Sequence, residues 1–304
     1  MPIGPCSELW STRINMGNNS SALEFCCEKC TLWLGVSMRK RKFCLALFFI
    51  CVIPVNALQQ RADQEIIRQA RQSYYDLKTQ GLVELRCVVQ PDWDSLYKSV
   101  NPDKVGIEQL LPILKGTHFT VLLGPAGAST ISHDSDTAPP SENVAERIRQ
   151  SVDGMEQILT GFFHTWSGFM FNSMLPEPDS KYHLEELGEK YALSFDEKTD
   201  QVAMVLNHQL AIEEVKVSTS DFDATLHPQW SPSSNGLVLA GYEANYKGTS
   251  SDPMKLSVQI EYREVEGLSL PSIVNAQVPI AAGNVSIRLV FLNYQVKKRD
   301  SATK

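Results

Sequence analysis

Apolar residues recur at three- and four-residue spacing between residues 67 and 77. The positions that share this spacing are Ile67, Ala70, Tyr74 and Leu77. Such spacing is typical of a helix with one buried face, and Gly81 stands where a helix commonly ends. The pattern therefore predicts a helix from about Ala62 to Thr79.

The period then changes to two residues. Val83, Leu85, Cys87 and Val89 alternate with their neighbours until Pro91, which predicts a strand with one buried face. Cys87 is on that face and is expected to be a packed thiol, because no general base is evident beside it. Residues 93–114 are irregular and predict short helices broken at Pro102 and Pro112, and residues 118–133 predict a hairpin around a glycine-rich turn.

A long helix is predicted within "SENVAERIRQSVDGMEQILTGFFHTWSGFMF", residues 141–171. Ser141 is a good N-cap. Apolar residues follow by fours and threes along one stripe for roughly 28 residues. Gly154, Gly161 and Gly168 form a second stripe beside it. Each interior glycine costs about 1 kcal/mol relative to alanine, a penalty that close backbone approach or space for a ligand would offset.

Two interpretations of this helix stay open. It is either a core helix that lies against a sheet or a helix that lines an apolar cavity, since four aromatic residues crowd its C-terminal end. The candidate residues for such a cavity are Gly154, Met155, Leu159, Gly161, Phe162, Phe163, Trp166 and Phe169.

Everything after Pro178 predicts antiparallel sheet with short, turn-rich connections. The candidate strands lie near residues 182–187, 190–197, 201–206, 210–218, 237–246, 255–265, 272–279 and 285–296. Eight or more strands, with helices that must cover one face, predict an α+β fold. We expect a strongly curved antiparallel sheet or open barrel whose concave face is covered by helices.

A resemblance to a known family rests on "IEYREVEGLSLPSIVNAQV" and "LVFLNYQV". The first segment has a strand ending in Tyr262, a Glu266-Gly267 turn, and then Leu268 and Leu270-Pro271 opening the next strand. This arrangement is similar to the C-terminal sheet of periplasmic lipoprotein-carrier (LolA-like) and related lipid-binding proteins. The chain also resembles secreted bacterial proteins. The LolA-like resemblance implies an incomplete barrel lined with apolar side chains, helices over its opening, and an acyl chain, lipid or lipoprotein as the partner.

The stretch "MRKRKFCLALFFICVIPVNALQQ", residues 38–60, has the layout of a secretory signal peptide. Four basic residues precede an apolar run that is shorter than the roughly 20 residues of a membrane-spanning helix. We predict a signal peptide over residues 38–57, cleaved after Ala57, and a periplasmic or secreted product. Residues 1–37 are then a mis-assigned start or a disordered extension, and residues 58–304 form a single helix-covered antiparallel β domain.

N-terminal sequencing of the protein exported from its native host checks this prediction. We expect the first residue to be Leu58, because the small side chain of Ala57 suits the cleavage site. An exported product that retains residues upstream of Met38 contradicts both the start and the cleavage.

Composition narrows the function classes. Without residues 1–57 the chain holds 22 Lys and Arg against 32 Asp and Glu, and Cys87 is its one cysteine. The resulting negative charge disfavours nucleic acid as a partner, and one cysteine excludes an internal disulfide. The CCEKC stretch lacks the second cysteine pair of a zinc site, and no metal, cofactor or integral membrane span is predicted for the mature chain.

Three function classes remain open. The first is a non-enzymatic carrier or sensor of a lipid-like ligand, and the second is a structural or protein-interaction domain without a ligand. The third is a hydrolase that would use some of His118, His164, His183, His208 and His227. The hydrolase is disfavoured because Gly-x-Ser-x-Gly, His-Glu-x-x-His and a phosphate-binding glycine loop are all missing from the mature sequence.

Overall fold

The structure is a computed structural model that describes residues 55–100, 107–135, 139, 141–249, 253–280 and 283–299. The predictions for residues 1–37 and for the signal peptide up to residue 54 lie outside the described residues. Residues 61–304 form one compact unit, which holds all the strands that the structure describes.

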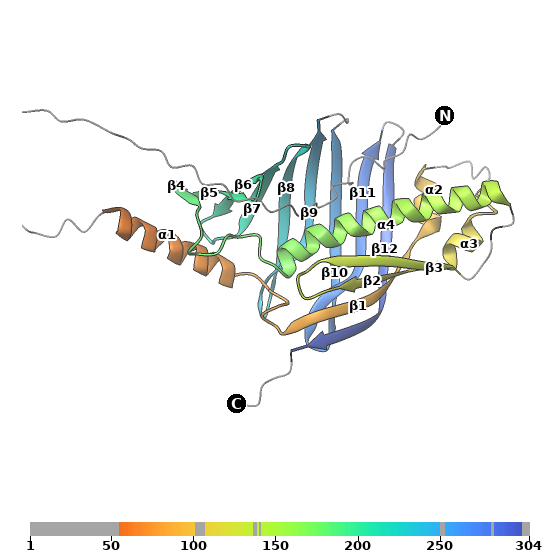
Figure 1. Ribbon diagram of the computed structural model, residues 1–304, viewed down its shortest axis with the longest axis horizontal. Coiled ribbons are helices and arrows are strands. Elements are labelled where there is room, and N and C mark those ends of the chain that lie inside the picture. The colour runs from red at the N-terminus through yellow and green to blue at the C-terminus, as the bar shows by residue number, and fades with distance from the viewer. Residues whose placement is uncertain are drawn as a thin grey trace, which may run out of the picture. The chain divides into compact units, whose positions relative to one another are not determined.

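A twelve-stranded antiparallel sheet dominates this unit (Figure 1). Its strand order is β3-β2-β1-β12-β11-β10-β9-β8-β7-β6-β5-β4, so the sheet is open, with β3 and β4 at its two edges. The strands are β1 (Leu82–Pro91), β2 (Thr117–Leu123), β3 (Ser129–Ser135), β4 (His183–Leu187), β5 (Lys190–Glu197), β6 (Asp200–Asn207), β7 (Ile212–Ser218), β8 (Phe222–Ser233), β9 (Gly236–Gly248), β10 (Met254–Val265), β11 (Leu268–Ile280) and β12 (Gly283–Lys298). With four helices, α1 to α4, this confirms the predicted α+β class.

The strands that come first and last along the chain, β1 and β12, lie side by side in the sheet. β1 pairs with β12 along most of its length, and β2 and β3 then extend the sheet beyond β1. β10 and β11 are joined at Glu266 and Gly267, whose φ angles of 51° and 75° suit a tight hairpin turn of the primed type. The hairpin predicted for residues 118–133 is confirmed as β2 and β3.

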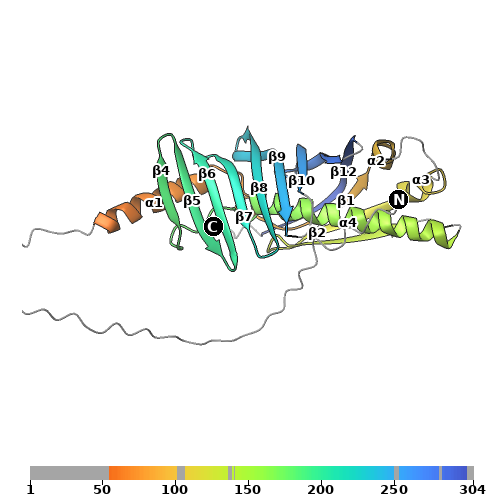
Figure 2. The ribbon, with the colours of Figure 1, turned by 90° about the horizontal axis from the view of Figure 1, so that it is seen from above.

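The long helix α4 (Glu142–Met170) lies against the sheet with its apolar stripe buried (Figure 2). The Ser141 hydroxyl accepts a hydrogen bond from the Val144 N–H, which confirms the predicted N-cap. The buried residues of α4, of α1 (Val55–Gln72) and of the sheet belong to one hydrophobic cluster. Both helices thus contribute to a single core.

The first predicted helix is wrong at its C-terminal end. α1 stops at Gln72 rather than near Thr79, because the residues that follow pair with β9. The Tyr75 N–H donates to the Leu237 carbonyl at 2.9 Å, and the Leu237 N–H donates to the Ser73 carbonyl at 2.8 Å. A tertiary pairing therefore overrides a local pattern that continues to Leu77.

Strand β8 was not predicted from the sequence. Its sequence holds Pro228 and Pro232, and proline disfavours a strand because it has no N–H to donate. However, β8 pairs with β7 only from Asp223 to Leu226. The prolines lie beyond that point, where β8 has no backbone pairing with β7 and an N–H on that side is not needed. Pro112 was also misinterpreted, since it lies in the first turn of α3 (Leu111–Lys115) and begins the helix.

α2 (Trp93–Val100) packs against β12. Within the part of the chain that the structure describes, no helix is both long and apolar enough to cross a membrane.

Candidate functional site

The six large side chains predicted to line a cavity are all buried. Met155, Leu159, Phe162, Phe163, Trp166 and Phe169 have between 0% and 5% of their surface exposed. Phe163 contacts Trp166 and Phe291 edge to face, each with ring centroids 6.0 Å apart. Most of this set therefore fills the core between α4 and the sheet, and Phe169 borders a cleft.

Gly154 and Gly161 lie where α4 has open space beside it. A Cβ atom added at either glycine would meet no heavy atom within 4 Å, and both residues are half-buried. Close backbone approach therefore does not explain these two glycines. At Gly168 an added Cβ would be in ordinary contact with the Met174 side chain at 3.8 Å.

The cleft at the C-terminal end of α4 is the candidate site. It has a volume of about 350 Å³ and is partly open to solvent. Its walls come from the end of α1 and the turn after it, the loop that leaves α4, and strands β7 and β8. Volumes of roughly 300–1,000 Å³ are typical of sites for small molecules.

Three aromatic rings form the wall of the cleft. Trp230 contacts Tyr74 with ring centroids 4.7 Å apart and Phe169 with centroids 5.6 Å apart, both edge to face. Such pairs are typically worth about 0.5–1.5 kcal/mol beyond the burial of their area. Met174, Leu175 and Ile212 add aliphatic surface. The wall is thus apolar and held in place by its own contacts.

Hydrogen bonds orient two of these rings. The Tyr74 hydroxyl donates to the Leu210 carbonyl at 3.0 Å and accepts from the Ile212 N–H at 2.6 Å. The Trp230 Nε1–H donates to the Ile212 carbonyl at 2.8 Å. Burial raises the pKa of Tyr74 well above its usual range, so the phenol stays neutral. Both aromatic residues therefore tie the cleft wall to the start of β7.

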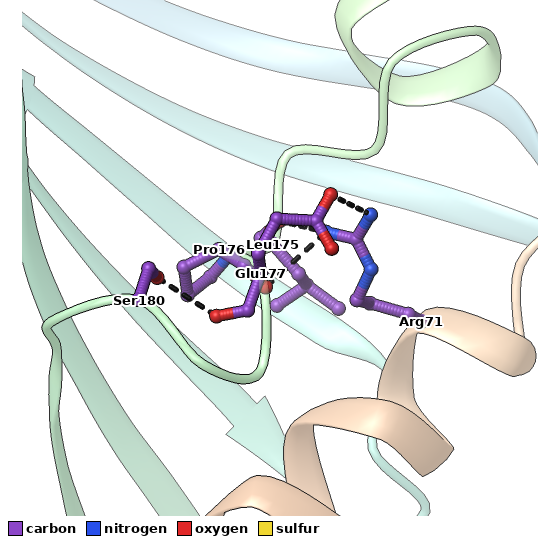
Figure 3. Close-up of polar contacts among 5 residues, drawn as sticks. All are labelled: Arg71, Leu175, Pro176, Glu177 and Ser180. Carbon is purple, nitrogen blue, oxygen red and sulfur yellow. Dashed lines mark hydrogen bonds and ion pairs between the residues drawn. The ribbon is translucent and has the colours of Figure 1, made fainter.

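Arg71 anchors the loop that closes one side of the cleft (Figure 3). Its guanidinium donates to the carbonyls of Leu175 and Pro176 and pairs with the Glu177 carboxylate at 2.7 Å. The Ser180 hydroxyl donates to the Glu177 carbonyl at 2.8 Å within the same loop. One side chain from α1 thus holds the connection between α4 and β4.

Gly236 permits the turn after α1 to reach the sheet. Its φ angle is +118°, and an added Cβ would lie 2.7 Å from the Tyr74 carbonyl carbon. Only glycine adopts this conformation without strain and leaves room for a neighbouring backbone. The position of Tyr74 in the cleft therefore depends on Gly236.

Polar groups surround the mouth of the cleft. Gln72, Asp76, Thr79 and Asn235 line it together with Arg71. An apolar wall with a polar rim suits a ligand that has an apolar body and a polar end.

The histidines considered for a hydrolase lie on separate elements. His118 is on β2, His164 on α4, His183 on β4, His208 in the turn after β6, and His227 on β8. Burial raises the pKa of the Cys87 thiol to about 12, which leaves it protonated and unreactive. The structure confirms that Cys87 is buried, as its place in the alternating strand predicted.

Three residues of the cleft, Arg71, Tyr74 and Trp230, were not predicted as site residues from the sequence. Arg71 and Tyr74 fell within the predicted helix, and Trp230 fell in the unpredicted strand β8. The signal for Trp230 was a large aromatic residue between two prolines, in "HPQWSPS". Of the eight candidates named from the sequence, Phe169 lines this cleft.

Comparisons with protein-family models, with curated proteins and with solved structures found no match for this chain.

Proposed function

We propose that this protein is a non-enzymatic binder of a lipid-like molecule and that the cleft at the end of α4 is its binding site. The observation that carries the proposal is the wall of Tyr74, Phe169 and Trp230 around a hollow of about 350 Å³. An apolar chain would lie against the rings, and its polar end would meet the rim near Gln72 and Asn235. The resemblance of the β10–β11 region to LolA-like proteins supports the same class of ligand.

We further infer that the sheet is strongly curved and that α1 and α4 cover its concave face. Support comes from the shared hydrophobic cluster, in which Ile67 and Ala70 of α1 and the apolar stripe of α4 are buried with the same sheet. A concave face would bring both helices and the cleft to one side. The ligand would then enter where α1 ends and α4 ends.

Export fits this role. A basic segment followed by an apolar run at residues 39–57 supports a periplasmic or secreted location, where a carrier or sensor of lipids would meet its ligand.

The test is a titration of residues 58–304 with a fatty acid that carries an environment-sensitive fluorophore. We expect saturable binding in the micromolar range. Asn235→Trp should weaken binding at least about tenfold, which is about 1.4 kcal/mol. Asn235 is exposed at the rim, so an indole there fills the mouth of the cleft without removing a core contact.

Asn245→Trp is the matched control, because Asn245 is an exposed residue of β9 that does not line the cleft. Its affinity should equal that of the wild type. Failure of the wild type to bind any fatty acid, together with no lipid in mass spectra of the purified protein, would leave a structural or protein-interaction domain. If the Asn235→Trp variant binds the fatty acid as tightly as the wild type does, the binding site is not this cleft.

A further inference from the structure

A second hollow lies on the part of the sheet formed by β3, β2, β1 and β12. It has a volume of about 450 Å³ and is open to solvent. Its lining includes Glu84 and Arg86 of β1, Thr120 of β2, Ser132 of β3 and Lys297 of β12. We call this hollow the outer groove.

The outer groove is on the face of the sheet that α4 does not cover. Leu85 and Cys87 of β1 are 1% exposed and belong to the core, so the alternate residues Glu84 and Arg86 point to the opposite face. In β2, Val121 and Leu123 are buried while Leu122 is 39% exposed. The groove is therefore separated from the cleft and from the core by the sheet itself.

The same alternation continues into the edge strand. On β3, His133 faces α4, since its Nδ1 lies 2.7 Å from the Glu156 carboxylate. Thr130 and Ser132, on the two sides of Ile131, line the groove instead. The hydroxyls of Thr120, Thr130 and Ser132 thus lie on one surface with the Gln295 amide.

Two cations of the groove are available to a ligand. Among the described residues, Arg86 and Lys297 make no hydrogen bond or ion pair through their side chains, and both are exposed. Both cations lie on one groove of a protein whose net charge is −7. Glu84 is the one carboxylate in the lining.

We propose that the outer groove binds an acidic saccharide. The carboxylate of a sugar acid would pair with the Arg86 guanidinium, which presents a planar fork of donors, and with the Lys297 ammonium. Its ring hydroxyls would exchange hydrogen bonds with Thr120, Ser132 and Gln295, since hydroxyls and amides both donate and accept. The apolar face of the ring would lie on Leu122.

Glu84 places a negative charge beside the cations of the outer groove. Its Cα is paired with that of Lys297 across the two strands, so a bound carboxylate would lie close to a like charge. Replacing it by glutamine removes this repulsion and keeps the size of the side chain. The outer groove of the Glu84→Gln variant should therefore bind a sugar acid more tightly than that of the wild type.

The experiment is a titration of residues 58–304 with sodium glucuronate, monitored by the chemical shifts of backbone amides in β1, β2, β3 and β12. We expect saturable shifts confined to these strands. Glucose, which lacks the carboxylate, should bind at least tenfold more weakly. Arg86→Gln and Lys297→Gln should each weaken glucuronate binding severalfold, and Glu84→Gln should strengthen it.

Lys255→Gln is the control for a lost surface cation, because Lys255 is exposed on β10 and lies outside the groove. Its affinity for glucuronate should be unchanged. Asn235→Trp should also leave glucuronate binding unchanged, so failure of the lipid proposal and failure of this one are distinguishable.

Three results would overturn the assignment. The first is no saturable shift with glucuronate in the wild type. The second is equal affinity of Arg86→Gln and the wild type. The third is inorganic phosphate that shifts the same amides as strongly as glucuronate, because the groove would then recognise charge alone and not a saccharide.

Discussion

Trp166→Ala is expected to lower the free energy of unfolding by about 3–5 kcal/mol, the usual cost of removing a large buried aromatic side chain. Trp166 is 0% exposed and its ring contacts Phe163 edge to face. Its Nε1–H donates to the Tyr262 hydroxyl at 3.0 Å, which in turn donates to the Leu239 carbonyl at 2.7 Å. The substitution leaves a cavity between α4 and the sheet and removes the donor to Tyr262.

Urea unfolding followed by far-ultraviolet circular dichroism measures this loss. Gly161→Ala, five positions earlier on the same helix, is the control. An added Cβ there meets nothing within 4 Å, so alanine should stabilise the helix by about 1 kcal/mol. The two alanine substitutions on this helix would then change the free energy of unfolding in opposite directions. A Trp166→Ala variant as stable as the wild type would show that α4 is not packed on the sheet.

Gly241→Ala should lower the free energy of unfolding by about 1–3 kcal/mol through overpacking. A Cβ at position 241 would lie 2.4 Å from the Val258 carbonyl oxygen of the neighbouring strand β10. That oxygen belongs to backbone held in the β9–β10 pairing, where Gly241 is opposite Gln259. It cannot move away as the end of a flexible side chain would, so β9 and β10 must separate locally.

Gly124→Ala is the matched control for this second variant. In the turn between β2 and β3, an added Cβ would meet its nearest atom, the Ala128 carbonyl oxygen, at 3.8 Å, which is ordinary contact. We expect a change well below that of Gly241→Ala in the same urea titration. Equal losses for the two variants would mean that the close approach of β9 to β10 is not the cause, because the entropy lost by the unfolded chain on replacing glycine by alanine favours the folded state at both positions.

The elements with a long and regular period were predictable from the sequence. α4 begins next to Ser141 as expected, and the alternation in β1 and β10 correctly identified both strands and the burial of Cys87. These predictions succeeded because one apolar face repeats often enough to identify the period. The α+β class followed from the number of strands and helices.

The candidate site was much less predictable. Gly154 and Gly161 were considered for a cavity, but periodicity places a residue on a helix stripe without saying what lies opposite it. Tyr74 was assigned to a helix because its spacing suited one. Its hydrogen bonds to Leu210 and Ile212 join segments far apart in the chain, and no local pattern reports such contacts.

The sequence by itself determined which residues are buried along α4 and, from Leu85 to Val89, along β1, because side-chain period follows from backbone geometry alone. Only the tertiary structure decided where α1 ends, since the backbone of Ser73 and Tyr75 finds its partners in β9. It also decided that "HPQWSPS" belongs to a strand, because the pairing of β8 with β7 stops at Leu226, before the prolines, and β9 pairs with β8 along the whole stretch. Those two decisions bring Tyr74 and Trp230 together, and long-range backbone pairing is their common physical cause.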